Sequence, residues 1–159
     1  MKEVLFLGSA NYYRSRFAEQ LFNSLAQQSG LPWRARSRGL LVGKWGDVGP
    51  MSGSAIEALR SRGVEIDSDQ RPPTPLAQRD LVHASVIAAM KEGEHGPLMA
   101  EQFPEWADLV EYWNVDDVDW ADPHDALALL EESVRDLVAR LAATSDAEIS
   151  FVAEEPVLA

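Results

Sequence analysis

The segment Val4–Glu19 constrains the fold of this chain more than any other. Its apolar run Val4–Leu7 predicts a buried strand, and apolar residues then recur at helical spacing at Phe17, Leu21 and Leu25. Small and polar residues separate the two patterns. The segment therefore predicts a strand that passes through a tight loop into a helix. Such a junction points backbone N–H groups and the positive end of the helix dipole at one place, which favours an anion.

The loop residues themselves support an oxyanion site. Arg14 stands where the loop enters the helix, and its planar guanidinium matches the geometry of phosphate oxygens. Backbone N–H groups can cradle the same anion whatever side chains they carry. The candidate phosphate-binding residues are Gly8, Ser9, Ala10, Asn11, Tyr12, Tyr13, Arg14 and Ser15.

This loop resembles that of the low-molecular-weight protein tyrosine phosphatases, whose fold some arsenate reductases share. The family carries the pattern C-x-x-x-x-x-R-S between a strand and a helix, and here Arg14-Ser15 and the loop Asn11 fit it. The run Tyr12–Glu19 is similar to a bacterial branch of this family. The resemblance extends to Ser37-Arg38-Gly39 and to an Asp-Pro pair near the end of the chain.

The departure from the family lies at the nucleophile. Gly8 occupies the cysteine position, Ala10 stands where the family usually has glycine, and the chain contains no cysteine. Thiolate catalysis, disulfides and an arsenate-reducing thiol cascade are therefore excluded. The sequence predicts the scaffold of a phosphatase without its nucleophile.

Strand and helix patterns alternate along the rest of the chain. Strands are expected at 4–7, 32–39, 85–90 and 109–115, and helices at 16–28, from a capping box at 54–57, near 74–81, at 97–103 and in a long last segment. Residues 91–95 are expected to form an exit loop. This order predicts a single three-layer α/β/α domain over residues 1–143, with a four-stranded parallel sheet and helices on both faces. Residues 144–159 are expected to form a loosely packed acidic tail.

The remaining candidate site residues follow other strands. In a parallel sheet the loops beyond the carboxyl ends of the strands meet at one edge, so the segments around Trp45 and 117–123 should reach the loop. The resemblance implies that Trp45, with Tyr12, lines a substrate cleft; a half-exposed packing role is the alternative. It also implies that Asp122 is the catalytic acid beside Arg14. Asp117 and Asp119 compete for that role, and an acidic helix N-terminus is the plainer interpretation of all three.

Composition limits the partners. The chain has 159 residues, 46% of them hydrophobic, with a formal net charge of −12. This charge argues against nucleic acid and membrane surfaces as partners. No signal peptide or membrane span is expected, which predicts a cytoplasmic protein. No metal or cofactor is expected either. The sequence does not predict an oligomeric state.

The favoured hypothesis is a pseudophosphatase that binds phosphate or a phosphorylated protein or small molecule. One alternative is a weak phosphomonoesterase that uses water or Ser9, and another is an interaction module whose loop is only structural. No Ser–His pair is predicted, because His83, His95 and His124 are scattered. The loose match of Gln70-Arg71 to a family signature receives little weight.

Overall fold

The computed structural model describes residues 1–67, 69–117 and 122–154. Four strands form one parallel sheet in the order β2-β1-β3-β4. β1 (Lys2–Gly8) lies inside, between β2 (Trp33–Gly39) and β3 (Val86–Ala89), and β4 (Glu111–Tyr112) forms the far edge. The expected α/β fold with a four-stranded parallel sheet is therefore confirmed.

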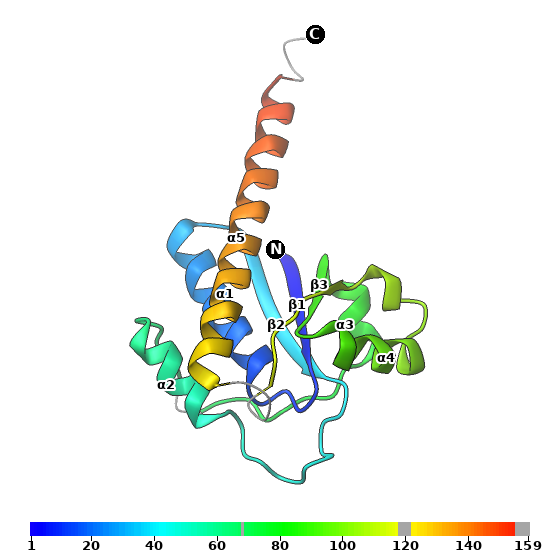
Figure 1. Cartoon of the computed structure of the whole chain (residues 1–159). Coiled ribbons are helices and arrows are strands. Elements are labelled where there is room, and N and C mark those ends of the chain that lie inside the picture. The colour runs from blue at the N-terminus through cyan, green and yellow to red at the C-terminus, as the bar shows by residue number, and fades with distance from the viewer. Residues whose placement is uncertain (68, 118–121, 155–159) are drawn as a thin grey trace.

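Helices cover both faces of this sheet (Figure 1). One face carries α1 (Arg14–Ser29), α2 (Gly53–Ser61) and α5 (Pro123–Glu154). The other carries α3 (Gln78–His83), α4 (Glu92–Gln102) and the short 3-10 helix η1 (Ala107–Leu109). The domain thus has three layers.

Alternation along β1 explains the two cores. Val4 and Phe6 join the cluster under α1 and α5, whereas Leu5 and Leu7 join the cluster under α3. Successive side chains of a strand point to opposite faces, so an uninterrupted apolar run is what a strand buried on both sides requires. All four side chains are at most 2% exposed.

The start of α4 differs from the expectation in a way that matters for the site. Residues 91–95 were expected as an exit loop and Pro97 as the beginning of a helix. Instead the carbonyl of Lys91 accepts the N–H groups of Glu94 (3.2 Å) and His95 (2.8 Å), so the first turn closes directly after β3. Pro97 lies inside the helix. Glu94 and His95 are consequently placed at the edge where the strands end.

The last strand is shorter than the expected 109–115. η1 occupies residues 107–109, and regular pairing of β4 with β3 covers only Glu111 and Tyr112. Hydrogen bonds to the β3 side nevertheless continue, from Trp113 N to Ala89 O and from Val115 N to Met90 O, both 2.8 Å. The chain therefore stays hydrogen-bonded to the β3 side of the sheet as far as Val115, which lies beside the loop between β1 and α1.

Two helix boundaries also differ from the expectation. α2 begins at Gly53, one residue before the predicted capping box at 54–57. The N-cap is Ser52, whose Oγ accepts the N–H of Ala55 at 3.4 Å. α5 continues through Glu154, so the expected division after residue 143 falls within a helix. Figure 1 shows α5 running past the sheet, away from the edge that carries the loop. None of the described helices combines the length and apolar character needed to cross a membrane.

Candidate functional site: an arginine loop with an internal carboxylate

The loop between β1 and α1 is held by Asn11. This residue adopts a left-handed backbone (φ 56°), a conformation that asparagine tolerates better than most side chains. Its Nδ2 donates to Ser15 Oγ and Ser37 Oγ, both at 3.0 Å. Its Oδ1 accepts from Thr74 N at 3.0 Å and from Arg71 at 3.2 Å. All four hydrogen bonds tie the loop to its surroundings.

A second layer of polar groups supports Asn11 from below. Ser37 donates to Glu19 Oε2 at 2.9 Å, and Arg71 Nη2 lies 3.1 Å from each Glu19 oxygen. The buried Arg16 donates to the carbonyls of Pro50 (3.1 Å) and Arg71 (2.8 Å). Arg71, whose match to a family signature received little weight, therefore connects the loop, β2 and α1 through its hydrogen bonds. No local sequence pattern predicts these contacts, because the partners of Arg71 are far away in the sequence.

Arg14 lies at the base of the site and is only 4% exposed. Its Nη1 donates to Glu94 Oε2 at 2.8 Å and to the carbonyl of Val115 at 2.9 Å. Its Nη2 donates to Glu94 Oε1 at 3.0 Å and lies 3.5 Å from Asp117. Arg14 and Glu94 thus form a two-pronged ion pair, the strongest arrangement of these two groups.

Glu94 and His95 also contact Ser9, contrary to the expectation that no Ser–His pair exists. Ser9 Oγ donates to Glu94 Oε1 at 2.8 Å and lies 3.0 Å from Nε2 of the fully buried His95. Lys91 N donates to His95 Nδ1 at 3.1 Å. The proton of the neutral ring is therefore on Nε2, which donates to Ser9. In this arrangement His95 cannot accept the Ser9 proton.

The environment keeps Glu94 charged and His95 neutral. Burial alone would raise the pKa of Glu94, but hydrogen bonding and charge from Arg14 outweigh it and lower that pKa to about 2. Burial, reinforced by the positive charge of Arg14 and only partly opposed by Glu94, lowers the pKa of His95 to about 4. Near neutral pH the cluster therefore holds an ion pair beside an uncharged imidazole.

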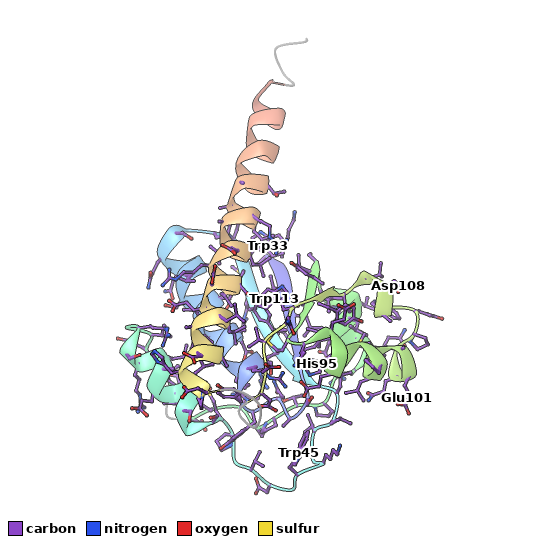
Figure 2. The ribbon with its side chains drawn as sticks, viewed as in Figure 1. Trp33, Trp45, His95, Glu101, Asp108 and Trp113 are labelled. Atoms are coloured by element: carbon purple, nitrogen blue, oxygen red, sulfur yellow. The ribbon has the colours of Figure 1, made fainter. Side chains whose placement is uncertain are left out.

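A pocket of about 170 Å³ opens above this cluster. The structure brings most of the predicted site residues together around it: its walls include Gly8, Ser9, Ala10, Asn11, Tyr12, Tyr13, Arg14 and Ser15, joined by Trp45, Val48, Ser52 and Asp117. Figure 2 shows Trp45 on the long loop beyond the sheet edge and His95 deeper in the molecule. Trp45 is 53% exposed, so the structure places it at the rim.

The two tyrosines differ in position. Tyr12 is half-buried, whereas Tyr13 is 6% exposed and its hydroxyl donates to the carbonyl of Pro123 at 3.4 Å. Burial, together with the negative charge of Asp117, raises the pKa of Tyr13 to about 12. Tyr13 also occupies the N-cap position of α1 without giving a side-chain hydrogen bond to the first turn. The helix therefore has no side-chain cap at the end that faces the pocket.

The three candidate acids are placed differently. Asp117 lines the pocket. Asp122 is exposed and is absent from the lining; its Oδ1 accepts the N–H of His124 at 2.8 Å at the start of α5. This is the contact expected of an acidic helix N-terminus, and the catalytic role of Asp122 stays a prediction. Asp119 lies outside the described residues.

Gly8 leaves the nucleophile position without a side chain. A Cβ added there would lie 3.0 Å from Ser15 Oγ, so the serine would have to move by a few tenths of an ångström. In the described part of the chain, no three His, Asp or Glu side chains form a group that could hold a metal ion.

Comparisons with known proteins agree with this geometry. The family model described as low molecular weight phosphotyrosine protein phosphatase matches residues 3–147. A protein-arginine-phosphatase of Bacillus subtilis (strain 168) is 30% identical over 108 residues, which cover 68% of this chain and 67% of the relative.

Solved structures give the same result. A YwlE mutant from B. subtilis superposes with a TM-score of 0.75 and 25% identity, covering 89% of this chain and 99% of that one. A low molecular weight protein tyrosine phosphatase from T. tengcongensis gives 0.73 and 25%, covering 91% and 99%. The chain thus belongs to the low molecular weight phosphotyrosine protein phosphatase family, as a member without cysteine.

Proposed function

We propose that this protein is a pseudophosphatase that binds a phosphorylated ligand in the Gly8–Ser15 loop and does not turn it over through a thiolate. The observation that carries the proposal is the intact frame of the loop around Gly8. Asn11 holds its left-handed turn with four hydrogen bonds, and Arg14 lies buried at the base of the pocket. The uncapped first turn of α1 offers further N–H donors to an oxyanion.

The absence of a nucleophile argues against efficient hydrolysis. Glycine offers no side-chain atom that can attack phosphorus, and loss of its nucleophile lowers the turnover of the protease subtilisin by about a million-fold. Ser9 is a weak substitute. Its hydroxyl proton is directed at Glu94, whose low pKa makes it a poor base, and His95 donates to Ser9 instead of accepting from it.

The names of the relatives suggest which ligands to test. One relative is named a protein-arginine-phosphatase and another a protein tyrosine phosphatase. Phosphoarginine and phosphotyrosine are therefore compared with inorganic phosphate as ligands of the unaltered chain. Binding is followed by the NMR shifts of the amides of residues 8–15, and hydrolysis by release of phosphate. We expect saturable binding in the millimolar range or tighter, with no release of phosphate.

A matched pair of variants tests the role of the loop arginine. Arg14→Lys keeps the charge but removes the planar fork, so phosphate binding should be lost. Arg38→Lys is the control, because Arg38 is also largely buried and pairs with a carboxylate, Asp80 at 3.3 Å, away from this pocket. Equal binding by both variants, or no shift of the loop amides at millimolar ligand, would contradict the proposal.

A further inference from the structure

Glu94 does not line the pocket itself, but its carboxylate binds two of the residues that do, Arg14 and Ser9. Its carboxylate accepts hydrogen bonds from Arg14 Nη1 (2.8 Å), Arg14 Nη2 (3.0 Å) and Ser9 Oγ (2.8 Å). Two of these donors belong to the guanidinium and one to the loop, and both Ser9 and Arg14 line the pocket. The chain therefore supplies its own oxyanion to the groups that are proposed to bind phosphate.

The remaining donors of Arg14 are few. A guanidinium has five N–H groups. Nη1 uses both of its hydrogens, on Glu94 and on the carbonyl of Val115, and Nη2 uses one on Glu94. The other Nη2 hydrogen is on the atom that lies 3.5 Å from Asp117. The fifth N–H, on Nε, has no hydrogen bond among the described contacts. A ligand that binds either Nη atom must therefore share or displace these carboxylates.

The formal charge of the cluster also opposes a strongly anionic ligand. Arg14 contributes one positive charge, whereas Glu94 and Asp117 contribute two negative charges, so the sum is +1 − 2 = −1. His95 is buried next to Ser9 as a neutral ring and does not restore the balance. Electrostatic repulsion grows in proportion to the charge of the ligand, so a dianion is affected twice as strongly as a monoanion.

We infer that Glu94 is an internal counter-ion that lowers the affinity of this pocket for dianions, so that the site favours phosphorylated ligands of lower net negative charge. The inference rests on the proposed function, because it describes the selectivity of the same pocket. Glu94 is suited to this role by its place in the third position of α4, where the helix holds it against the loop and its side chain is 31% exposed.

The test compares two tetrahedral anions that do not titrate near neutral pH. Sulfate is a dianion and perchlorate a monoanion, and each is titrated at pH 7.5 into the unaltered chain and into Glu94→Gln. Gln keeps the size of the side chain and removes its charge. Sulfate should bind about tenfold or more tightly to Glu94→Gln, and perchlorate only about threefold more tightly, the square root of the effect on a dianion.

Glu92→Gln is the matched control. Glu92 lies in the same first turn of α4, is exposed, and has no hydrogen bond or ion pair of its side chain within the described contacts. Its substitution removes the same charge from the same helix, so sulfate affinity should change by less than about twofold. Glu94→Gln also removes one partner of a mostly buried ion pair, so thermal unfolding is recorded for each variant to show that it is folded. Glu94→Asp, which keeps the charge but withdraws it by one methylene, should give an intermediate affinity for sulfate.

The outcomes separate the two proposals. Unchanged or weaker sulfate binding by folded Glu94→Gln would overturn the inference and would make Glu94 a residue that positions Arg14 for the ligand. An equal gain for sulfate and perchlorate would also overturn it, because charge would not be the cause. Binding by Glu94→Gln but not by the unaltered chain would support the inference and count against the proposed function. No binding by either protein would overturn both.

Discussion

Acid should destabilise this protein through His95. The buried ring has a pKa of about 4 in the folded state, against an ordinary value of 6.5. Between these two values the unfolded chain binds a proton that the folded chain rejects, so the free energy of unfolding falls as the pH falls. The contribution of His95 is fully present above about pH 7 and is lost progressively toward pH 4.

The size of the effect follows from the shift in pKa. Linkage gives a loss of about 2 kcal/mol between pH 7.5 and pH 5, and about 3 kcal/mol by pH 4. Glu94, whose pKa is lowered to about 2, adds a further loss only below its ordinary value of 4.5. With a urea dependence of about 2 kcal/mol per molar, the first loss lowers the unfolding midpoint by about 1 M.

Urea unfolding at pH 7.5, 6, 5 and 4 measures this loss, and variants isolate the part due to His95. His95→Asn keeps an acceptor near the position of Nδ1 but cannot titrate, so its stability should fall less steeply with pH. His83 and His124 are exposed, and replacing either with Asn should leave the steep dependence unchanged. Parallel pH curves for the unaltered chain and His95→Asn would refute the argument, because the burial of a neutral imidazole would then carry no linkage.

Three other perturbations have definite expected results. Gly8→Cys should hydrolyse an aryl phosphate at least about tenfold faster than the unaltered chain, because the thiolate enters a frame that needs only a small shift of Ser15. Arg71→Ala should lower the free energy of unfolding by about 3 kcal/mol, because it leaves the buried carboxylate of Glu19 without its closest cation. Burial in the folded state raises the pKa of Tyr13 from 10.0 to about 12, so the free energy of unfolding of the unaltered chain should fall by about 1 kcal/mol on going to pH 11. Tyr13→Phe should abolish this fall.

Each of these predictions has a control. An unaltered hydrolysis rate in folded Gly8→Cys would mean that the loop geometry does not support thiolate attack. Arg79→Ala serves beside Arg71→Ala, since Arg79 is exposed and should cost less than about 0.5 kcal/mol. For Tyr13, the comparison is made by urea unfolding at pH 9 and 11; an identical loss in the phenylalanine variant would assign the alkaline effect to other groups.

The parts of the fold that the sequence predicted are those encoded by local patterns. The apolar run of β1 is continuous because both faces of that strand are covered, and the helical spacing after Arg14 predicts α1 to within two residues at each end. Gly30, with φ 68°, ends α1 as its position predicts. These signals need no knowledge of distant segments.

The internal carboxylate could not be predicted in the same way. Glu94 and Ser9 are 85 positions apart, and their contact depends on α4 beginning directly after β3. Glycine at position 93 lowers helix propensity, and proline at position 97 is typical of the first turn of a helix, so the pattern favours a loop at 91–95 and a helix that begins at Pro97. Contacts with distant segments oppose that preference, because Glu94 bonds Arg14 and Ser9 and the N–H of Glu92 donates to the carbonyl of Trp113 at 3.0 Å. A pattern-based search for a Ser–His pair fails for the same reason.

The support of the loop is independent of its nucleophile, which explains how the frame can persist without cysteine. Asn11, Ser37, Glu19 and Arg71 bond to one another, and none of these contacts involves a side chain at position 8. Buried polar groups of this kind are costly to leave unpaired, so the network resists change whether or not catalysis occurs. Support of the fold alone is therefore enough to account for Asn11 and its partners, and their presence does not distinguish turnover from binding. The case for ligand binding rests on this frame together with Arg14, which is buried, lines the pocket and is held by the carboxylate of Glu94.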